Sequence, residues 1–254
     1  MEEHERDGWG RQDFPPWRIQ DVFYVTCLFW VSELGIKSLI EGLWFRNVPL
    51  SRFDNSLDKV LQVLALATLG QRTAISIVLF VAVIYVVRCR HRLSLAGIGW
   101  SLQISREWLC SAFLIGIADG VLSFFLIIWI SDGLPAGWKF TDSNGNPMIP
   151  VISVYLIVSG IQAPIIEELF FRGFCYTAFR KHLGTSVGIL LSSIHFILCH
   201  YNILNLPALT LALFLSNVIL CMAYEKTKSL VPSIVIHSTM NTMILICSWI
   251  SDQV

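Results

Sequence analysis

The chain has 254 residues, of which 55% are hydrophobic and 14% charged, and its formal net charge is zero. Soluble domains carry roughly 25% charged residues, so this composition excludes an ordinary soluble protein and indicates several membrane-spanning helices. The balanced charge gives no indication of nucleic-acid binding. The cysteines include no C-x-x-C pair, so we expect neither a disulfide framework nor a cysteine-based zinc site.

The first 45 residues predict a polar tail followed by a membrane span. Residues 1–20 are charged and carry proline and tryptophan, which predicts an interfacial tail. Residues 22–45 are apolar and long enough to span. This span carries Glu33, Lys37 and Glu41, whose four-residue spacing aligns them on one helix face. We expect these charges to neutralise one another inside the bundle; the alternative is a polar path for a ligand.

The middle of the chain predicts one interfacial helix and two further spans. Residues 46–58 predict a polar loop. Residues 59–69 are apolar but too short to span, which predicts an interfacial or re-entrant helix. Residues 73–87 predict a short second span, and residues 106–130 a third. Asp119 lies in the middle of that third span, where it either pairs inside the bundle or belongs to a functional site.

The C-terminal part predicts four spans, which bring the total to about seven. Residues 148–171 predict the fourth span, whose helix continues to Leu183 and ends at Gly184. Residues 186–204, 207–224 and 232–250 predict the fifth, sixth and seventh spans. The predicted fold class is therefore an all-α, polytopic transmembrane helical bundle.

The distribution of Lys and Arg predicts how this bundle is oriented. Basic residues are concentrated after the second, fourth and sixth spans, at residues 88–106, 180–181 and 226–228. These connections and the N-terminus are therefore expected in the cytoplasm. The basic residues between positions 46 and 72 do not follow this pattern.

Two adjacent carboxylates, Glu167 and Glu168, interrupt the apolar run of the fourth span. Burying ionised carboxylates in hydrocarbon is costly, so intramembrane acids usually face a polar cavity and serve a function. Arg172 follows Glu168 by four residues, which predicts an ion pair on one helix face. Adjacent helical residues point about 100° apart, so Glu167 is left free for another role. The alternative is a buried Glu–Arg pair with a spare glutamate.

The polar residues of three different spans are predicted to converge. Glu167 lies 17 residues before Gly184 and His200 lies 16 residues after it. At a helical rise of about 1.5 Å per residue, both side chains lie roughly 25 Å from the turn, at the same depth. His237 and Asn241 are four residues apart and share one face of the seventh span. The shared depth favours a common site.

These residue types fit hydrolysis of an acyl bond by an activated water. A carboxylate such as Glu167 can act as a base, and a neighbouring histidine can share the proton. The Asn241 amide can donate to a developing oxyanion, and a histidine can also bind a metal. A covalent Ser or Cys nucleophile is not favoured, because none has an evident base partner. The alternative for each histidine is a core residue bonded to the backbone, and for His195 we favour it.

Three motifs in this order resemble a known family of membrane proteases. The motifs are Glu-Glu-x-x-x-Arg at residues 167–172, Phe-x-x-x-His at residues 196–200 and His-x-x-x-Asn at residues 237–241. Their order resembles the CAAX protease and bacteriocin-processing (CPBP/Abi) intramembrane endopeptidases, which include type II CAAX prenyl endopeptidases. The resemblance covers about residues 148–245.

The resemblance implies an α-helical bundle with a cytoplasm-facing intramembrane cavity. It implies that Glu167 is the general base and activates water with His200. Asn241 and His237 would stabilise the oxyanion, while Glu168 and Arg172 would hold the frame. No cofactor is required in this interpretation. If a metal such as zinc is bound, Glu167, His200 and His237 would be its ligands.

The sequence thus predicts a polar tail (1–20), N-terminal membrane helices (21–147) and a catalytic membrane core (148–254). The predicted function is an intramembrane endopeptidase whose substrate is a lipidated or membrane-embedded protein or peptide, in CAAX-type prenyl-protein processing or in bacteriocin or self-immunity processing. A transporter or proton relay is the first alternative, because carboxylate–histidine chains also carry protons. A catalytically silent scaffold of the same fold is the second.

Overall fold

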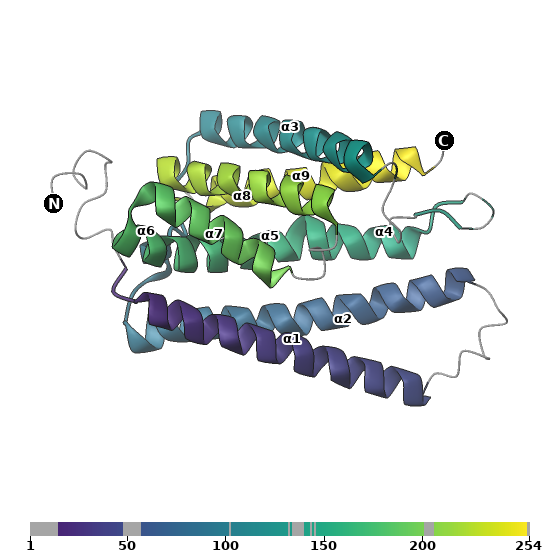
Figure 1. Ribbon diagram of the computed structural model, residues 1–254, viewed down its shortest axis with the longest axis horizontal. Helices are drawn as coiled ribbons and strands as arrows, with labels where there is room; N and C mark the ends of the chain where they lie inside the picture. Colours follow the sequence, from purple (N-terminus) through teal and green to yellow (C-terminus); the bar gives the residue numbers. More distant parts are fainter. Residues whose placement is uncertain are drawn as a thin grey trace.

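The computed structural model describes residues 15–47, 57–101, 103–131, 133, 140–142, 144, 146–200 and 206–252. Within these residues the chain is helical apart from short connections and an isolated β-bridge between Thr141 and Pro147. The helices lie roughly along the long axis of the molecule (Figure 1). The predicted all-α fold class is confirmed. The predictions for the tail at 1–14, the loop at 48–56 and the span end at 201–204 lie outside the described residues.

The N-terminal half contributes three long helices. These are α1 (Ile19–Asn47), α2 (Leu57–Ile84), which continues as a π-helix over Tyr85–Arg90, and α3 (Arg106–Ser131), preceded by a short 3-10 turn at Leu95–Ile98. α1 and α2 lie next to each other as a pair beneath the rest of the bundle in Figure 1.

The C-terminal half begins with one continuous helical run of 35 residues from Ile149 to Leu183. Its parts are α4 (Ile149–Tyr155), the π-helix η5 (Leu156–Gln162), α5 (Ala163–Glu168), the π-helix η6 (Leu169–Tyr176) and α6 (Thr177–Leu183). Gly184 ends the run at φ 82°, as predicted from its position. The helices α7 (Thr185–Cys199), α8 (Pro207–Thr227) and α9 (Leu230–Ser251) follow.

α2 corrects the prediction for residues 59–87. The predicted interfacial helix at 59–69 and the short span at 73–87 are parts of one helix. Gly70 interrupts the apolar pattern, but one glycine inside a helix costs only about 1 kcal/mol relative to alanine. The polar residue Arg72 has a partner on α1, since its Nη1 lies 3.9 Å from Glu33 Oε1.

The predicted charge ladder on α1 is therefore only partly correct. Lys37 and Glu41 form the expected pair at 4.0 Å. Glu33 instead faces α2, where Gln71 Nε2 donates to its Oε1 at 3.4 Å and Arg72 lies close by. The sequence spacing could not distinguish a partner on the same helix from a partner on the next one.

Six helical runs in the described residues are long and apolar enough to cross a membrane. They are residues 19–42, 63–90, 106–131, 149–183, 207–227 and 230–251. α7 is also apolar but has 15 residues, about 22 Å of helix, which is less than the roughly 30 Å of bilayer hydrocarbon. Large apolar side chains on the outside, such as Trp129 at 82% exposure, suit a lipid environment. The protein is therefore a multi-pass integral membrane protein.

α3 packs tightly on α9 through two glycines one turn apart. A Cβ added at Gly116 would lie 2.7 Å from Thr239 Cβ, and one added at Gly120 would lie 2.7 Å from Met243 Cβ. Small residues spaced four apart let two membrane helices approach closely, which replaces the hydrophobic driving force that lipid does not provide. This contact fixes α9, and with it His237, against the bundle.

Candidate active site

Glu167 and Glu168 are the last two residues of a short α-helical stretch between two π-helices. α5 covers only Ala163–Glu168, with η5 before it and η6 after it. π-helical turns inside α-helices are rare and frequent at functional sites. The two carboxylates therefore lie where the helix register changes, and they point in different directions, as their adjacent positions predicted.

Glu168 belongs to a fully buried polar network. Its Oε1 lies 2.9 Å from Arg172 Nη1, and both side chains are 0% exposed. The predicted ion pair between these residues is confirmed. Arg172 Nη2 also donates to Asn217 Oδ1 on α8 at 2.6 Å, and its guanidinium lies 5.6 Å from the ring centre of Phe196. The network ties α5, η6, α7 and α8 together.

The same Glu168 holds His237 of α9. His237 Nδ1 lies 2.8 Å from Glu168 Oε1 in a buried contact. Because the carboxylate accepts, Nδ1 carries the hydrogen, and the ring presents Nε2 on its other side. That Nε2 lies 3.9 Å from Oε2 of Glu167.

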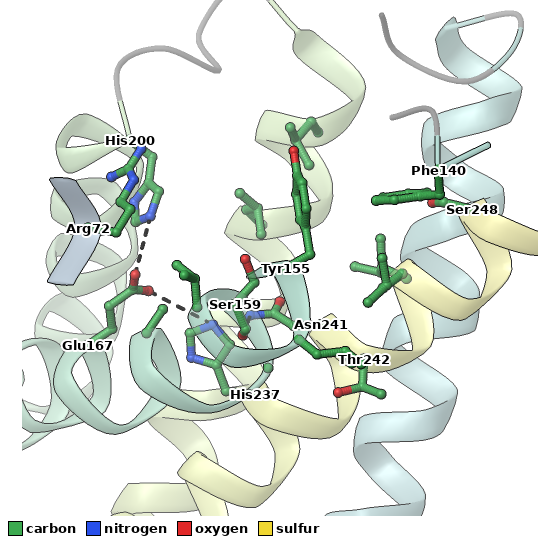
Figure 2. Close-up of a pocket in the computed structure, with 18 of the residues that line it drawn as sticks. Arg72, Phe140, Tyr155, Ser159, Glu167, His200, His237, Asn241, Thr242 and Ser248 are labelled. Carbon is green, nitrogen blue, oxygen red and sulfur yellow. Dashed lines mark hydrogen bonds and ion pairs between the residues drawn. The ribbon is translucent and has the colours of Figure 1, made fainter. Parts of the chain in front are cut away.

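His200 approaches the other oxygen of Glu167. Its Nε2 lies 3.7 Å from Glu167 Oε1. Its Nδ1 bonds the backbone oxygen of Phe196 at 2.9 Å, so Nδ1 is again the donor, because a carbonyl only accepts. The imidazole also stacks on the Phe196 ring, with centroids 4.2 Å apart. Figure 2 shows Glu167 between the two histidine rings.

These groups line one cavity of about 270 Å³. Glu167, with a side chain 21% exposed, faces it together with His200, His237 and Asn241. The predicted convergence of these residues is therefore observed. The cavity continues between η5 and α9 past apolar side chains, and its lining includes Phe140, Tyr155, Leu156, Val158, Leu209, Leu213, Ile244, Leu245 and Ser248 (Figure 2).

The far end of the cavity and the start of α1 lie toward opposite ends of the bundle. Trp17 donates from Nε1 to Phe174 O at 3.0 Å, beside α6. Phe140, at the other end, donates its N–H to Asp252 Oδ2 at 2.9 Å, just past α9. The prediction placed the N-terminus and the cavity opening together in the cytoplasm, whereas Phe140 of the cavity lining lies at the end of the bundle away from the N-terminus. Which end faces the cytoplasm stays a prediction.

Comparison with known proteins identifies the segment that carries this geometry. Residues 149–243 match the profile of the family described as "Type II CAAX prenyl endopeptidase Rce1-like". This chain carries an Rce1-like segment. All three motifs found in the sequence lie inside it. A protein of Escherichia coli described as "Uncharacterized 24.3 kDa protein" is 26% identical over 171 residues, which cover 66% of this chain and 76% of the relative. No solved structure matches.

Within the Rce1-like segment, Asn241 points at the protein backbone. Its Nδ2 donates to Ser159 O of η5 at 2.7 Å. Both residues line the cavity (Figure 2). Asn241 is therefore near Glu167 and the two histidines, as predicted, but the hydrogen bond it makes is to the helical run that carries Glu167.

The N-terminal half contributes a charged residue that the sequence analysis did not assign to the site. Arg72 of α2 lines the same cavity as Glu167, and its side chain is 42% exposed. A charged residue inside a predicted span is a signal for a functional site. Because the predicted second span began at residue 73, Arg72 was placed outside the membrane and this signal was missed.

Two other intramembrane polar residues have their own partners. His195 Nε2 lies 3.0 Å from Thr26 Oγ1 on α1, and the ring packs among phenylalanines, so it is a core histidine as predicted, but its partner is a side-chain hydroxyl and not the predicted backbone group. Asp119 Oδ1 accepts a hydrogen bond from Ser216 Oγ at 3.0 Å, which favours pairing inside the bundle.

The alternative zinc site can be judged from the geometry of its three expected ligands. Two ligands of one tetrahedral zinc at about 2.0–2.1 Å lie about 3.3 Å apart. The oxygens of Glu167 lie 3.7 and 3.9 Å from the Nε2 atoms of His200 and His237. In the part of the chain that the structure describes, no group of three or more His, Cys, Asp or Glu is arranged to hold a metal. As placed, these atoms lie farther apart than two ligands of one zinc ion, and the metal requirement stays a prediction.

Proposed function

We propose that this protein is a CAAX-type intramembrane endopeptidase that hydrolyses a peptide bond of a membrane-associated protein or peptide. The observation that carries the proposal is the Glu167 carboxylate, which faces the Nε2 atoms of two histidines in a cavity within the membrane. The Rce1-like segment supports the reaction class. The substrate is a lipidated or membrane-embedded chain that enters from the bilayer.

In the proposed reaction, Glu167 is the general base. A water held between Glu167 and His200 loses a proton to the carboxylate while its oxygen attacks the scissile carbonyl carbon. The tetrahedral oxyanion forms, and the C–N bond then breaks. The leaving amine takes that proton from Glu167, directly or after its transfer to Nε2 of His200, which yields one carboxylic acid and one amine. No covalent intermediate with the protein is needed.

The neighbouring residues fix these groups rather than react. Glu168 and Arg172 hold the Nδ1 side of His237, so its Nε2 is aimed at Glu167, and in the protonated ring that Nε2 donates to the developing oxyanion. Phe196 holds His200 in the same manner through its backbone oxygen. In this proposal residues 148–254 carry the chemistry, and the helices of residues 21–147 add Arg72 to the cavity wall.

A transporter or proton relay has less support from the geometry. A relay needs titratable groups linked across the depth of the membrane. Outside the cavity, two such groups interact with neighbouring side chains: Glu33 with Gln71 and Arg72 of α2, and Asp119 with Ser216. The titratable side chains around Glu167 form a compact cluster instead.

The test is cleavage of prenylated and unprenylated C-terminal peptides by the purified protein in detergent micelles, with products identified by mass. Glu167→Gln should lower the rate about 10²–10⁴-fold, because it removes the base while keeping the shape of the side chain. Glu41→Gln is the matched control, since the same change is made at an exposed site on α1. Equal cleavage by wild type and Glu167→Gln would contradict the mechanism.

A further inference from the structure

The helix that carries Glu167 contains a proline three residues earlier, which leaves one backbone carbonyl without its helical donor. Pro164 is at the start of α5 and has no N–H. Just before it, the backbone bonds five residues back, since the Ala163 N–H donates to Val158 O. In that register the next donor would be residue 164, and its acceptor would be Ser159 O. Proline cannot supply that bond.

The side chain of Asn241 supplies the missing donor. Its Nδ2 lies 2.7 Å from Ser159 O, a short and direct hydrogen bond. α9 can come this close to η5 because residue 160 is glycine: a Cβ there would lie 3.3 Å from Thr242 Oγ1. An unpaired carbonyl at membrane depth is strongly disfavoured, so some donor is required at this position.

We propose that Asn241 is a positioning residue that replaces the N–H missing at Pro164 and so fixes the helix register that aims Glu167 into the cavity. The proposal rests on the proposed function for its activity measurement, and it assigns Asn241 a role other than oxyanion donor. If Ser159 O lost its partner, the helix would close by changing register. A change of one residue turns a helical side chain by about 100°, which would turn Glu167 away from His200.

Restoring a backbone donor tests this role. Pro164→Ala adds an N–H, and Ser159 O then gains a backbone partner whichever register the helix takes: residue 164 in the π-register or residue 163 in the α-register. Asn241→Ala alone should lower kcat about 10–100-fold with a smaller change in KM, as expected of a misplaced base. The double variant Pro164→Ala/Asn241→Ala should cleave within about 3-fold of Pro164→Ala alone.

His200→Gln is the control for specificity of the rescue. The activity lost in His200→Gln does not depend on the hydrogen bond to Ser159 O, so adding Pro164→Ala should not restore that activity. If the double variant stays as inactive as Asn241→Ala, Asn241 acts on the substrate directly and the positioning role is refuted. Full activity of Asn241→Ala would refute it as well.

The thermal midpoint Tm, measured in detergent on wild type, the two single variants and the double variant, tests the contact without any substrate. Asn241→Ala should lower Tm by about 2–4 °C, and Pro164→Ala should cancel most of that loss in the double variant. Additive Tm changes would refute the link between Pro164 and Asn241. If wild type cleaves no peptide while the Tm values are coupled, the proposed function fails and the link stands.

Discussion

The buried pair of Glu168 and Arg172 is expected to make a large contribution to stability. Both side chains are 0% exposed, and the closest atoms lie 2.9 Å apart. Replacing Arg172 by Met keeps the approximate length of the side chain and removes its charge. The carboxylate of Glu168 then lies in an apolar interior without a counter-charge, which costs about 3–5 kcal/mol. For a domain of this size, that corresponds to a fall in Tm of about 6–20 °C.

The assay is thermal unfolding in detergent, followed by tryptophan fluorescence. Glu168→Gln/Arg172→Met should recover most of the lost Tm, because a neutral pair needs no counter-charge and the amide oxygen introduced at position 168 can still accept from His237. Arg88→Met is the matched control: Arg88 is exposed, so its replacement should move Tm by less than about 2 °C.

Two results would refute this reasoning. The first is an Arg172→Met protein as stable as the control, since a buried carboxylate cannot lose its partner without cost. The second is a double variant no more stable than Arg172→Met, because the loss would then come from packing rather than from charge. In that case the 5.6 Å contact of Arg172 with Phe196 would be the main contribution.

Further predictions concern the α1–α2 contact, the α3–α9 contact and metal dependence. Arg72→Gln should lower the free energy of unfolding by about 1 kcal/mol, a small value because solvent screens a side chain that is 42% exposed. Adding Glu33→Gln should restore this loss in the double variant. Gly120→Ala should lower the free energy of unfolding by about 1–3 kcal/mol, since its Cβ would lie 2.8 Å from Met240 O. Gly70→Ala has no such neighbour and should raise the free energy of unfolding by about 0.5–1 kcal/mol. Thermal melts measure both changes. A chelator should leave the rate of peptide cleavage unchanged, and a rate restored specifically by added zinc would contradict that expectation.

The depth of the site could be predicted from the sequence because it depends on helix geometry alone. Glu167 and His200 are nearly equidistant from the turn at Gly184, and a constant rise per residue brings them to one level. The structure has this arrangement even though part of the helix is π-helical. The ion pair of Glu168 and Arg172 could also be predicted from the sequence, because the four-residue spacing brings the two side chains together even across the start of η6.

The remaining contacts depend on which helix faces which, and no spacing rule gives that. Nothing local to Glu33 indicates that its partner is Arg72 on α2. The bond from Asn241 to Ser159 O joins residues 82 positions apart. It could be found only by asking which carbonyl Pro164 leaves unpaired, and that question requires the register of η5.

In the proposed mechanism, the two histidines are held so that the site carries one mobile proton. In each ring Nδ1 is already a donor, to Phe196 O in His200 and to Glu168 in His237. A neutral ring therefore turns a lone pair at Nε2 toward Glu167, and at 3.7–3.9 Å two facing lone pairs repel. A proton on Glu167, on one Nε2, or on a water between them removes that repulsion. Peptide hydrolysis takes a proton from water and gives it to the leaving amine. Between these two steps the proton can be held at any of these three positions.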